Sequence, residues 1–233
     1  MPALTAAFSL FYVLELPHSW QKPPTNQIPL IVYGASSAVG AYAIKLAIAA
    51  QIHPIIAIGS SNSEFLVGDL KPKEGDALLD YKSYADPEAL VKDIKSALED
   101  AGIEGGRAMH ALDAISLPGT FDDIVSRAIA GEPRMGKKPK MAVVLPGADY
   151  GSADPSVEVC ETYCGLAHQG GDVGKRFSMV HARLFTLGLS EGWFSAHPYE
   201  VRQGLESLQG ALEDHKAGRV RAKKVLLRIT DDE

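Results

Sequence analysis

A short apolar run that leads into a glycine-bounded loop and then into a helical pattern constrains the fold of this chain most. Residues 28–34 (IPLIVYG) are rich in branched side chains and follow a proline-rich stretch, which is typical of a buried strand. The loop 34–40 (GASSAVG) comes next, and residues 38–50 form a mostly apolar helical stretch. A strand, a tight glycine turn and a helix in this order predict one unit of a parallel βαβ sheet.

Similar alternation continues along the chain and predicts one fold class. We expect further strands over residues 53–59, 76–81, 107–115, 141–145 and 224–229, and helices over residues 86–102, 175–191 and 199–216. Asp86 is a good N-cap for the first of these helices, Pro87 suits its first position, and Gly102 ends it. The pattern predicts an α/β chain: a doubly wound parallel-sheet Rossmann domain over residues 25–233, after an N-terminal helix and linker over residues 1–24.

Composition excludes several function classes. The 233 residues carry 23 Lys plus Arg against 29 Asp plus Glu, a net charge of -6, without a sustained basic stretch. Nucleic acid and anionic membranes need a concentrated basic face, so neither is an expected partner. The apolar start has no preceding Lys or Arg and is interrupted by Glu15, which argues against a secretory signal. Two cysteines are too few for a disulfide framework and favour a reducing, cytoplasmic compartment.

The glycine loop has the chemistry of a pyrophosphate site. Gly34 permits the tight turn, Gly40 lets the helix pack closely on the strand, and the helix N-terminus offers free N–H groups and a positive dipole end. Ser36 stands where the G-x-G-x-x-G motif has its second glycine, so the match is incomplete. A plain structural turn is therefore the alternative interpretation.

The residues after the second expected strand bear on the cofactor. An NAD site usually has an acidic residue here that binds the ribose 2′-hydroxyl, whereas residues 59–63 (GSSNS) contain no acid before Glu64. Without a carboxylate there is no repulsion against a 2′-phosphate, and serine hydroxyls can donate to it, so NADPH is the expected cofactor. The same serines would also cap the next helix, and both roles can hold together.

Five segments in this order resemble a known family. They are YGASSAVGAYAIKLA (33–47), PIIAIGSSNSEFL (54–66), GDALLDYKS (75–83), ALDAIS (111–116) and MAVVLPG (141–147). The chain thereby resembles the cofactor domain of zinc-independent medium-chain dehydrogenases/reductases, notably quinone-oxidoreductase-like proteins and trans-acting enoyl reductases. Residues 4–7 resemble that family's inter-domain helix and residues 197–229 its C-terminal segment. The resemblance implies NADPH-dependent hydride transfer, without metal, to an activated C=C bond or a quinone in a small-molecule substrate.

Carried onto this sequence, the resemblance implies a site. Between Gly34 and Gly40, it assigns Ser36, Ser37, Ala38 and Val39 to the pyrophosphate, and it assigns Ser60, Ser61 and Asn62 to the 2′-phosphate. It places Tyr81 beside the adenosine, and Ala114, Ile115, Leu145 and Pro146 around the nicotinamide ribose. None of the four side chains assigned to the nicotinamide ribose can donate a proton to a substrate, so the resemblance assigns no catalytic residue.

One departure from the family raises a competing hypothesis. Family members begin with a separate barrel-like domain that forms the other wall of the cleft, whereas this sequence starts where that domain would have ended. Half of the substrate pocket is then expected to be absent, and the chain would be an inactive NADPH-binding remnant, or a subunit that needs a partner chain. An exposed apolar face on residues 3–14 would favour that hypothesis, and burial of this helix would favour a self-contained protein.

Other enzyme classes fit less well. The loop is one residue from the G-x-S-x-G elbow of α/β-hydrolases with Ser36 as the nucleophile, but a hydrolase needs several strands before its elbow. A short-chain dehydrogenase needs Tyr-x-x-x-Lys, and Tyr42 and Lys45 are one residue too close. A phosphate loop of the NTPase type needs Lys and Ser or Thr after its glycines, and Gly40 is followed by Ala41.

The two cysteines suggest a last alternative, a zinc site. Cys160, Cys164 and His168 would align on a helix, but residues 156–163 are better interpreted as a strand, on which the two sulfurs lie about 13 Å apart at ~3.3 Å per residue. We therefore expect two ordinary cysteines. In the family this stretch lies near the sheet edge used for dimerisation, so the resemblance implies a homodimer through residues 157–163.

Overall fold

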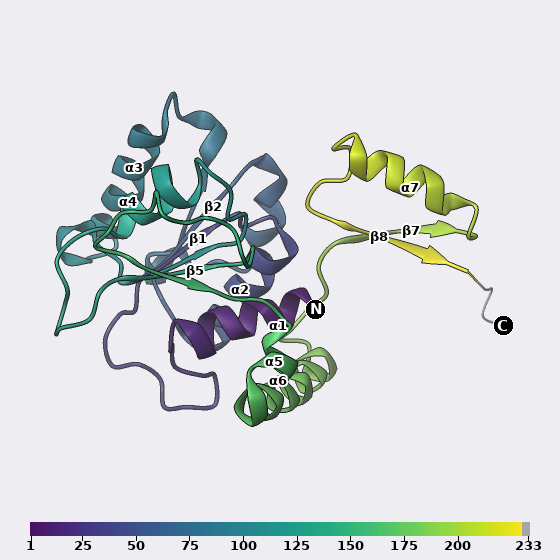
Figure 1. The fold of residues 1–233 in the computed structure, drawn as a ribbon, viewed down its shortest axis with the longest axis horizontal. Helices are drawn as coiled ribbons and strands as arrows, with labels where there is room; N and C mark the ends of the chain where they lie inside the picture. Colours follow the sequence, from purple (N-terminus) through teal and green to yellow (C-terminus); the bar gives the residue numbers. More distant parts are fainter. Residues whose placement is uncertain (230–233) are drawn as a thin grey trace. The chain divides into compact units, whose positions relative to one another are not determined.

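A computed structural model describes residues 1–229 and divides the chain into two compact units, Met1–Phe194 and the part from Ser195 onward. The larger unit is built on a six-stranded parallel sheet with the order β3-β2-β1-β4-β5-β6 (Figure 1). The strands are β1 (Leu30–Tyr33), β2 (Ile55–Gly59), β3 (Ala77–Asp80), β4 (His110–Asp113), β5 (Lys140–Val143) and β6 (Glu158–Glu161). The order changes direction at β1, which confirms the predicted doubly wound Rossmann fold.

Helices cover both faces of this sheet (Figure 1). On one face lie α1 (Pro2–Ala7) and α2 (Ala38–Ala49), and on the other α3 (Pro87–Asp100) and α4 (Arg127–Ile129). Alternate residues of β1 point to opposite layers: Leu30 and Val32 join the core beneath α1 and α2, whereas Ile31 and Tyr33 join the core beneath α3. Burial on both faces is the reason why the strands are continuous apolar runs.

Local signals set the helix ends as expected. The Asp86 carboxylate accepts a hydrogen bond from the Ala89 N–H at 2.8 Å, and Pro87 begins α3. Gly102 follows α3 with φ +84°. The Asp86 cap gives one backbone N–H at the helix start a partner, and Pro87 has no N–H that needs one.

The N-terminal segment is buried. After α1 the chain continues into a π-helical turn, Phe8–Val13, and Ala6, Ala7, Phe8 and Leu10 have no exposed surface. Most of these side chains join the core beneath α2. The apolar side chains at the start of the chain are therefore covered by the larger unit itself.

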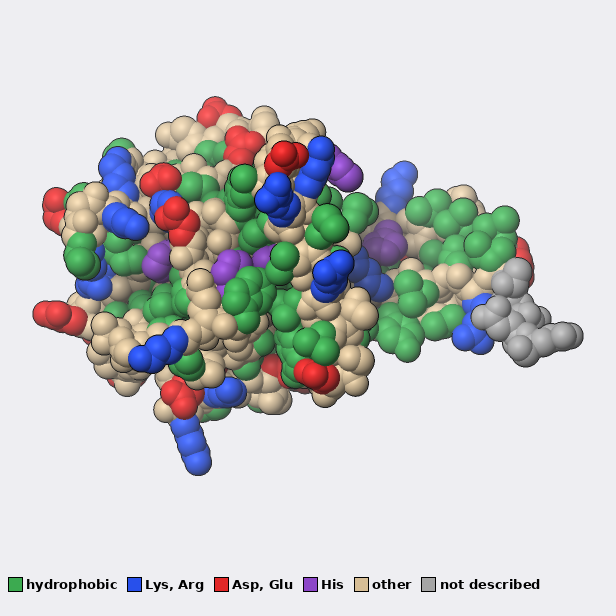
Figure 2. Space-filling model, turned by 90° about the horizontal axis from the view of Figure 1, so that it is seen from below, with side chains coloured by type: hydrophobic (Ala, Val, Ile, Leu, Met, Phe, Trp, Pro, Cys, Tyr) green, Lys and Arg blue, Asp and Glu red, His purple; other side chains and the backbone are tan. Residues whose placement is uncertain are grey.

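The long helix α6 (Gly171–Glu191), preceded by the single turn α5 (Leu166–Gln169), confirms the helix expected over residues 175–191. Its His181 ring stacks on Phe177 with ring centroids 3.9 Å apart, and the neighbouring His18 ring stacks on Trp20 at 4.2 Å. Figure 2 shows histidine and hydrophobic side chains gathered near the middle of the face of the larger unit seen from below. Burial lowers the pKa of His181 to about 4, so its imidazole is neutral at pH 7.

The edge strand β6 lies within the stretch predicted to be a strand, which places Cys160 on it and Cys164 after it. Both cysteines are free thiols. Among residues 1–229, no three His, Cys, Asp or Glu side chains are grouped so that they could hold a metal ion. Pairing of β6 with a second copy of the chain stays a prediction.

The smaller unit corrects one prediction. Its elements are β7 (Tyr199–Gln203), α7 (Ser207–Lys216) and β8 (Lys224–Arg228), so the helix expected over residues 199–216 is wrong in its first part. Tyr199 to Gln203 pair in parallel with Lys224 to Arg228. The spacing of Val201, Leu205 and Leu208 fits a helix, but strand pairing with a segment more than 20 residues away decides the conformation.

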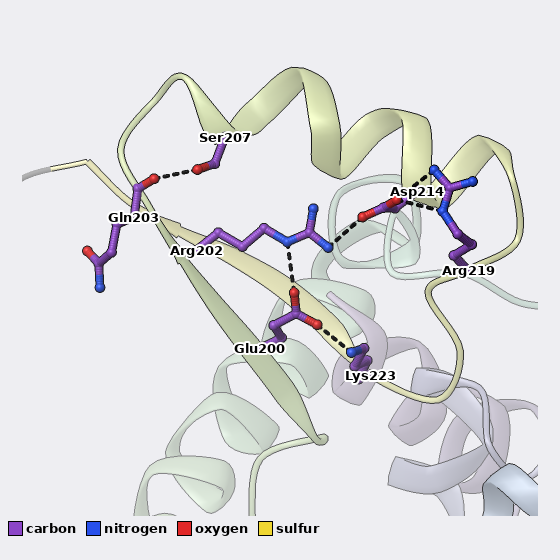
Figure 3. Close-up of polar contacts among 7 residues, drawn as sticks. All are labelled: Glu200, Arg202, Gln203, Ser207, Asp214, Arg219 and Lys223. Carbon is purple, nitrogen blue, oxygen red and sulfur yellow. Dashed lines mark hydrogen bonds and ion pairs between the residues drawn. The ribbon is translucent and has the colours of Figure 1, made fainter.

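Charged side chains tie the smaller unit together (Figure 3). The Arg202 guanidinium lies between two carboxylates, 2.8 Å from Glu200 and 2.6 Å from Asp214, and so joins β7 to α7. Lys223 pairs with the same Glu200, and Arg219 pairs with the same Asp214. These partners lower the pKa of both carboxyl groups. Because each carboxylate serves two cations, the network orders more side chains than isolated surface pairs would.

No helix within residues 1–229 combines the length and the apolar character needed to cross a membrane.

Candidate functional site

The carboxyl edge of the sheet is the place where this topology can form a binding crevice. The chain runs from β1 outward to β2 and β3, then crosses to β4 on the other side of β1. The loops after β1 and β4 therefore leave in opposite directions, and ligands of doubly wound sheets bind in the crevice that this divergence creates. The predicted site residues lie in the segments that directly follow strands β1 to β5 at this edge, either in loops or, for Ala38, Val39 and Gly40, in the first turn of α2.

The glycine loop is built as the sequence predicted. Gly34 has φ +76°, and a Cβ added there would lie 2.7 Å from Ile115 Cγ1, so this turn touches the loop after β4. A Cβ on Gly40 would lie 2.3 Å from the Gly34 carbonyl oxygen, which shows how closely α2 approaches the end of β1. A larger residue at either position would clash with these atoms. The geometry thus brings Gly34, Gly40 and Ile115 together.

The start of α2 leaves donors available. Ser37 is the N-cap, and its Oγ accepts the Gly40 N–H at 3.0 Å, while its own N–H donates to the Gly34 carbonyl at 2.9 Å. Residues 36–39 are only half-buried. The remaining N–H groups of the first turn and the positive end of the helix dipole can therefore face an anion.

The serines after β2 form a cap. Ser60 is 7% exposed, and its Oγ accepts from the Asn62 backbone N–H at 3.4 Å and from the Asn62 amide at 3.2 Å. Ser63 completes a capping box, since the Ser60 N–H donates to the Ser63 Oγ at 3.2 Å. The capping role is confirmed, and the 2′-phosphate role stays a prediction. Ser61 is exposed, so of the two serines it has the freer hydroxyl.

Tyr81 follows β3, the neighbour of β2. Its side chain is 41% exposed, and its ring centroid lies 6.2 Å from that of Tyr33 at the end of β1. The Lys82 ammonium lies over the Tyr81 ring, 5.9 Å from the centroid. Lys82 was missed by the sequence reasoning, although a cation directly after a strand adjacent to β2 is a usable signal. An adenine-sized aromatic surface and a positive charge thus lie at the same edge.

Beyond β1, the loops after β4 and β5 carry the remaining predicted residues. Ile115 is 37% exposed and Leu145 is 45% exposed, and each is followed closely by a turn. These side chains lie on the opposite side of β1 from Ser60 and Tyr81. The site therefore has two ends, a polar one beside β2 and β3 and an apolar one beside β4 and β5.

A buried carboxylate organises the apolar end, and it was missed by the sequence reasoning. Asp113 is fully buried, and its Oδ1 accepts from the backbone N–H groups of Ile115 at 2.9 Å and Ser116 at 2.8 Å. The Thr120 hydroxyl lies 2.6 Å from Oδ2. Burial raises the pKa of Asp113 despite these hydrogen bonds, which lower it. Asp113 also helps burial to raise the pKa of the adjacent Tyr33 to about 12.

Comparison with known proteins identifies relatives of this chain. The chain is 32% identical over 206 residues to trans-enoyl reductase fsr4 of Gibberella fujikuroi. The aligned region is 87% of this chain and 55% of that protein, so the chain spans little more than half of its relative. The chain is a relative of the trans-enoyl reductases within the medium-chain dehydrogenase/reductase superfamily. No family profile matches it.

Solved structures of other proteins share the fold of this chain. CurA of Vibrio vulnificus, crystallised in complex with NADPH, superposes on this chain with a TM-score of 0.64 at 17% identity. The superposed region is 100% of this chain and 63% of CurA. A mycobacterial quinone oxidoreductase superposes on this chain with the same TM-score of 0.64 at 18% identity, and the superposed region is 97% of this chain and 62% of that protein. At such identities the likeness establishes the fold alone.

Proposed function

We propose that this chain binds NADPH along the carboxyl edge of its sheet and takes part in reducing an activated carbon–carbon double bond. The observation that carries the proposal is the close approach of α2 to the end of β1 at the switch point, where a Cβ on Gly40 would lie 2.3 Å from the Gly34 carbonyl oxygen. This packing places the N-terminus of α2 at the carboxyl edge of the sheet, where its N–H groups can meet a phosphate. The relationship to trans-enoyl reductases supports the substrate class. A quinone is the alternative acceptor, and the likeness to a quinone oxidoreductase motivates testing it.

The residues present fit a phosphorylated dinucleotide. The first turn of α2 would hold the pyrophosphate, because its N–H groups and the small residues 36–39 allow close approach. Ser61 and Lys82 would meet the 2′-phosphate, and Tyr81 would flank the adenosine. Ile115 and Leu145 would shield the nicotinamide half from water. When bound, the reduced nicotinamide supplies the hydride for the reduction.

A titration of the purified chain with NADPH and, separately, with NADH tests the binding step. Micromolar binding of NADPH with clearly weaker NADH is expected, because no carboxylate lies before Glu64 after β2. Binding of neither nucleotide would refute the proposal. Equal binding of both would refute the 2′-phosphate assignment alone.

Turnover is measured next, by the NADPH oxidation that enoyl thioesters or quinones elicit from the bound complex. Oxidation with enoyl thioesters and not with quinones is the expected outcome. Binding of NADPH without turnover of either class would favour the competing hypothesis, a cofactor-binding chain whose activity needs a partner. Adding a separately expressed N-terminal region of a trans-enoyl reductase would then test whether a second chain restores turnover in trans.

A further inference from the structure

A side-chain hydrogen bond outside the strand pairing joins the loop after β4 to the loop after β5. The Ser116 Oγ donates to the Asp113 carbonyl at 2.7 Å and accepts the Val144 N–H at 2.8 Å. Ser116 is 2% exposed and has φ +60°, a backbone conformation that side-chain-bearing residues rarely adopt. A serine held in this way ties the turn after β4 to the backbone just beyond β5.

A second hydrogen bond fixes the far side of this junction. The Tyr150 hydroxyl donates to the Leu145 carbonyl at 2.7 Å, and the Tyr150 ring packs edge-on against Phe121 with centroids 4.9 Å apart. Leu145 is therefore held through its own carbonyl by Tyr150 and through the preceding amide by Ser116. The buried Asp113 carboxylate holds the other loop, since it takes the amides of Ile115 and Ser116.

We propose that Asp113, Ser116 and Tyr150 are positioning residues that fix the separation of Ile115 and Leu145 at the nicotinamide end of the site. We call these three residues the lip clamp. The hydrogen bonds of Ser116 and Tyr150, and those of Asp113 Oδ1, end on backbone groups of the two loops, and Asp113 Oδ2 meets the Thr120 hydroxyl. The three residues therefore act through the two apolar side chains. The inference rests on the proposed function, because it assigns the clamp to the nicotinamide half of the NADPH site.

If the lip clamp is broken, we expect the chain to bind NADPH more weakly. A net hydrogen bond contributes about 0.5 to 1.5 kcal/mol, so losing one shifts the equilibrium away from the binding-competent arrangement by roughly 2- to 13-fold. The affinity for NADPH should fall by the same factor. A ligand that reaches only the adenosine end, such as 2′,5′-ADP, should bind as before.

The experiment compares Ser116→Ala and Tyr150→Phe with a matched control, Ser126→Ala. Ser126 is also fully buried, and its Oγ likewise donates to a carbonyl (Asp122, 2.9 Å) and accepts a loop N–H (Asp154, 3.2 Å). Removal of the Ser126 hydroxyl should lower the free energy of unfolding by a similar amount while the hydrogen bonds of the lip clamp stay in place. The dissociation constants of NADPH and of 2′,5′-ADP are measured for each variant, together with the free energy of unfolding.

We expect Ser116→Ala and Tyr150→Phe to weaken the binding of NADPH about fivefold, within a range of roughly 2- to 13-fold, and to leave the binding of 2′,5′-ADP unchanged. Ser126→Ala should change neither constant. Equal NADPH affinity in the wild type and both lip variants would overturn the clamp while leaving the proposed function intact. Equal weakening by Ser126→Ala, or of 2′,5′-ADP, would show that the serine acts through general stability and would also overturn it. A wild type that binds neither ligand would instead refute the proposed function.

Discussion

Replacing Gly40 by alanine tests the close packing of α2 on the end of β1 most directly. The new Cβ would lie 2.3 Å from the Gly34 carbonyl oxygen, 3.0 Å from the Gly34 carbonyl carbon and 3.1 Å from Ala35 Cα. All three atoms belong to the backbone, so no side chain can rotate away. Real Cβ atoms essentially never approach another atom below 3.0 Å, so α2 must move away from the end of β1.

The magnitude follows from two opposing effects. Overpacking a rigid site typically costs about 1 to 3 kcal/mol, and contact with backbone places Gly40→Ala near the upper figure. Alanine is about 1 kcal/mol better than glycine inside a helix, which offsets part of that cost. The net loss is about 2 kcal/mol, or roughly 4 to 8 °C in melting temperature for a unit of this size. The displaced helix N-terminus should also weaken NADPH by about tenfold or more.

The assay combines thermal unfolding with an NADPH titration, and Gly68→Ala is the control. A Cβ on Gly68 meets no atom within 4 Å and needs no unusual φ, so this variant should stay within about 0.5 kcal/mol of the wild type. The reasoning is refuted if Gly40→Ala melts and binds NADPH like Gly68→Ala. A loss of stability with unchanged NADPH affinity would preserve the packing argument and refute the pyrophosphate assignment.

Two further predictions concern the cofactor's phosphate and the response to acid. Ser61→Asp should lower the preference for NADPH over NADH by about tenfold, because a carboxylate repels a 2′-phosphate, and titration with both nucleotides measures the ratio; an unchanged ratio would contradict the role of Ser61. Burial lowers the pKa of His110 and of His181 to about 4 from the ordinary 6.5, so the unfolded chain binds more protons between these values. The free energy of unfolding should therefore be highest above about pH 6.5 and fall by a few kcal/mol towards pH 4. His181→Phe keeps a ring against Phe177, so its free energy of unfolding, measured with denaturant at pH 6.5 and pH 4, should fall less than that of the wild type. An equal fall would contradict the contribution of His181 to the pH dependence.

The conformation of the glycine loop could be predicted because its signals are local. Gly34 and Gly40 lie six residues apart, and the turn between them depends on the backbone freedom and small size of those residues. The Asp86 cap of α3 is equally local, since it reaches only to Ala89. The lip clamp could not be predicted in the same way, because Ser116 meets an amide 28 residues later, and only the alignment of β4 beside β5 brings the two together.

The same contrast separates what sequence alone determined from what tertiary structure decided. Alternating apolar runs and helical patterns determined the α/β class and most elements, because burial on both faces of a sheet demands that pattern. Residues 199–203 have a spacing compatible with helix or strand, and only pairing with β8 made them a strand. The buried Asp113 is similar: its charge is tolerated in the core only because the folded loop supplies three donors to it. Long-range pairing decided these features, since hydrogen-bond partners far apart in the sequence exist only once the sheet has formed.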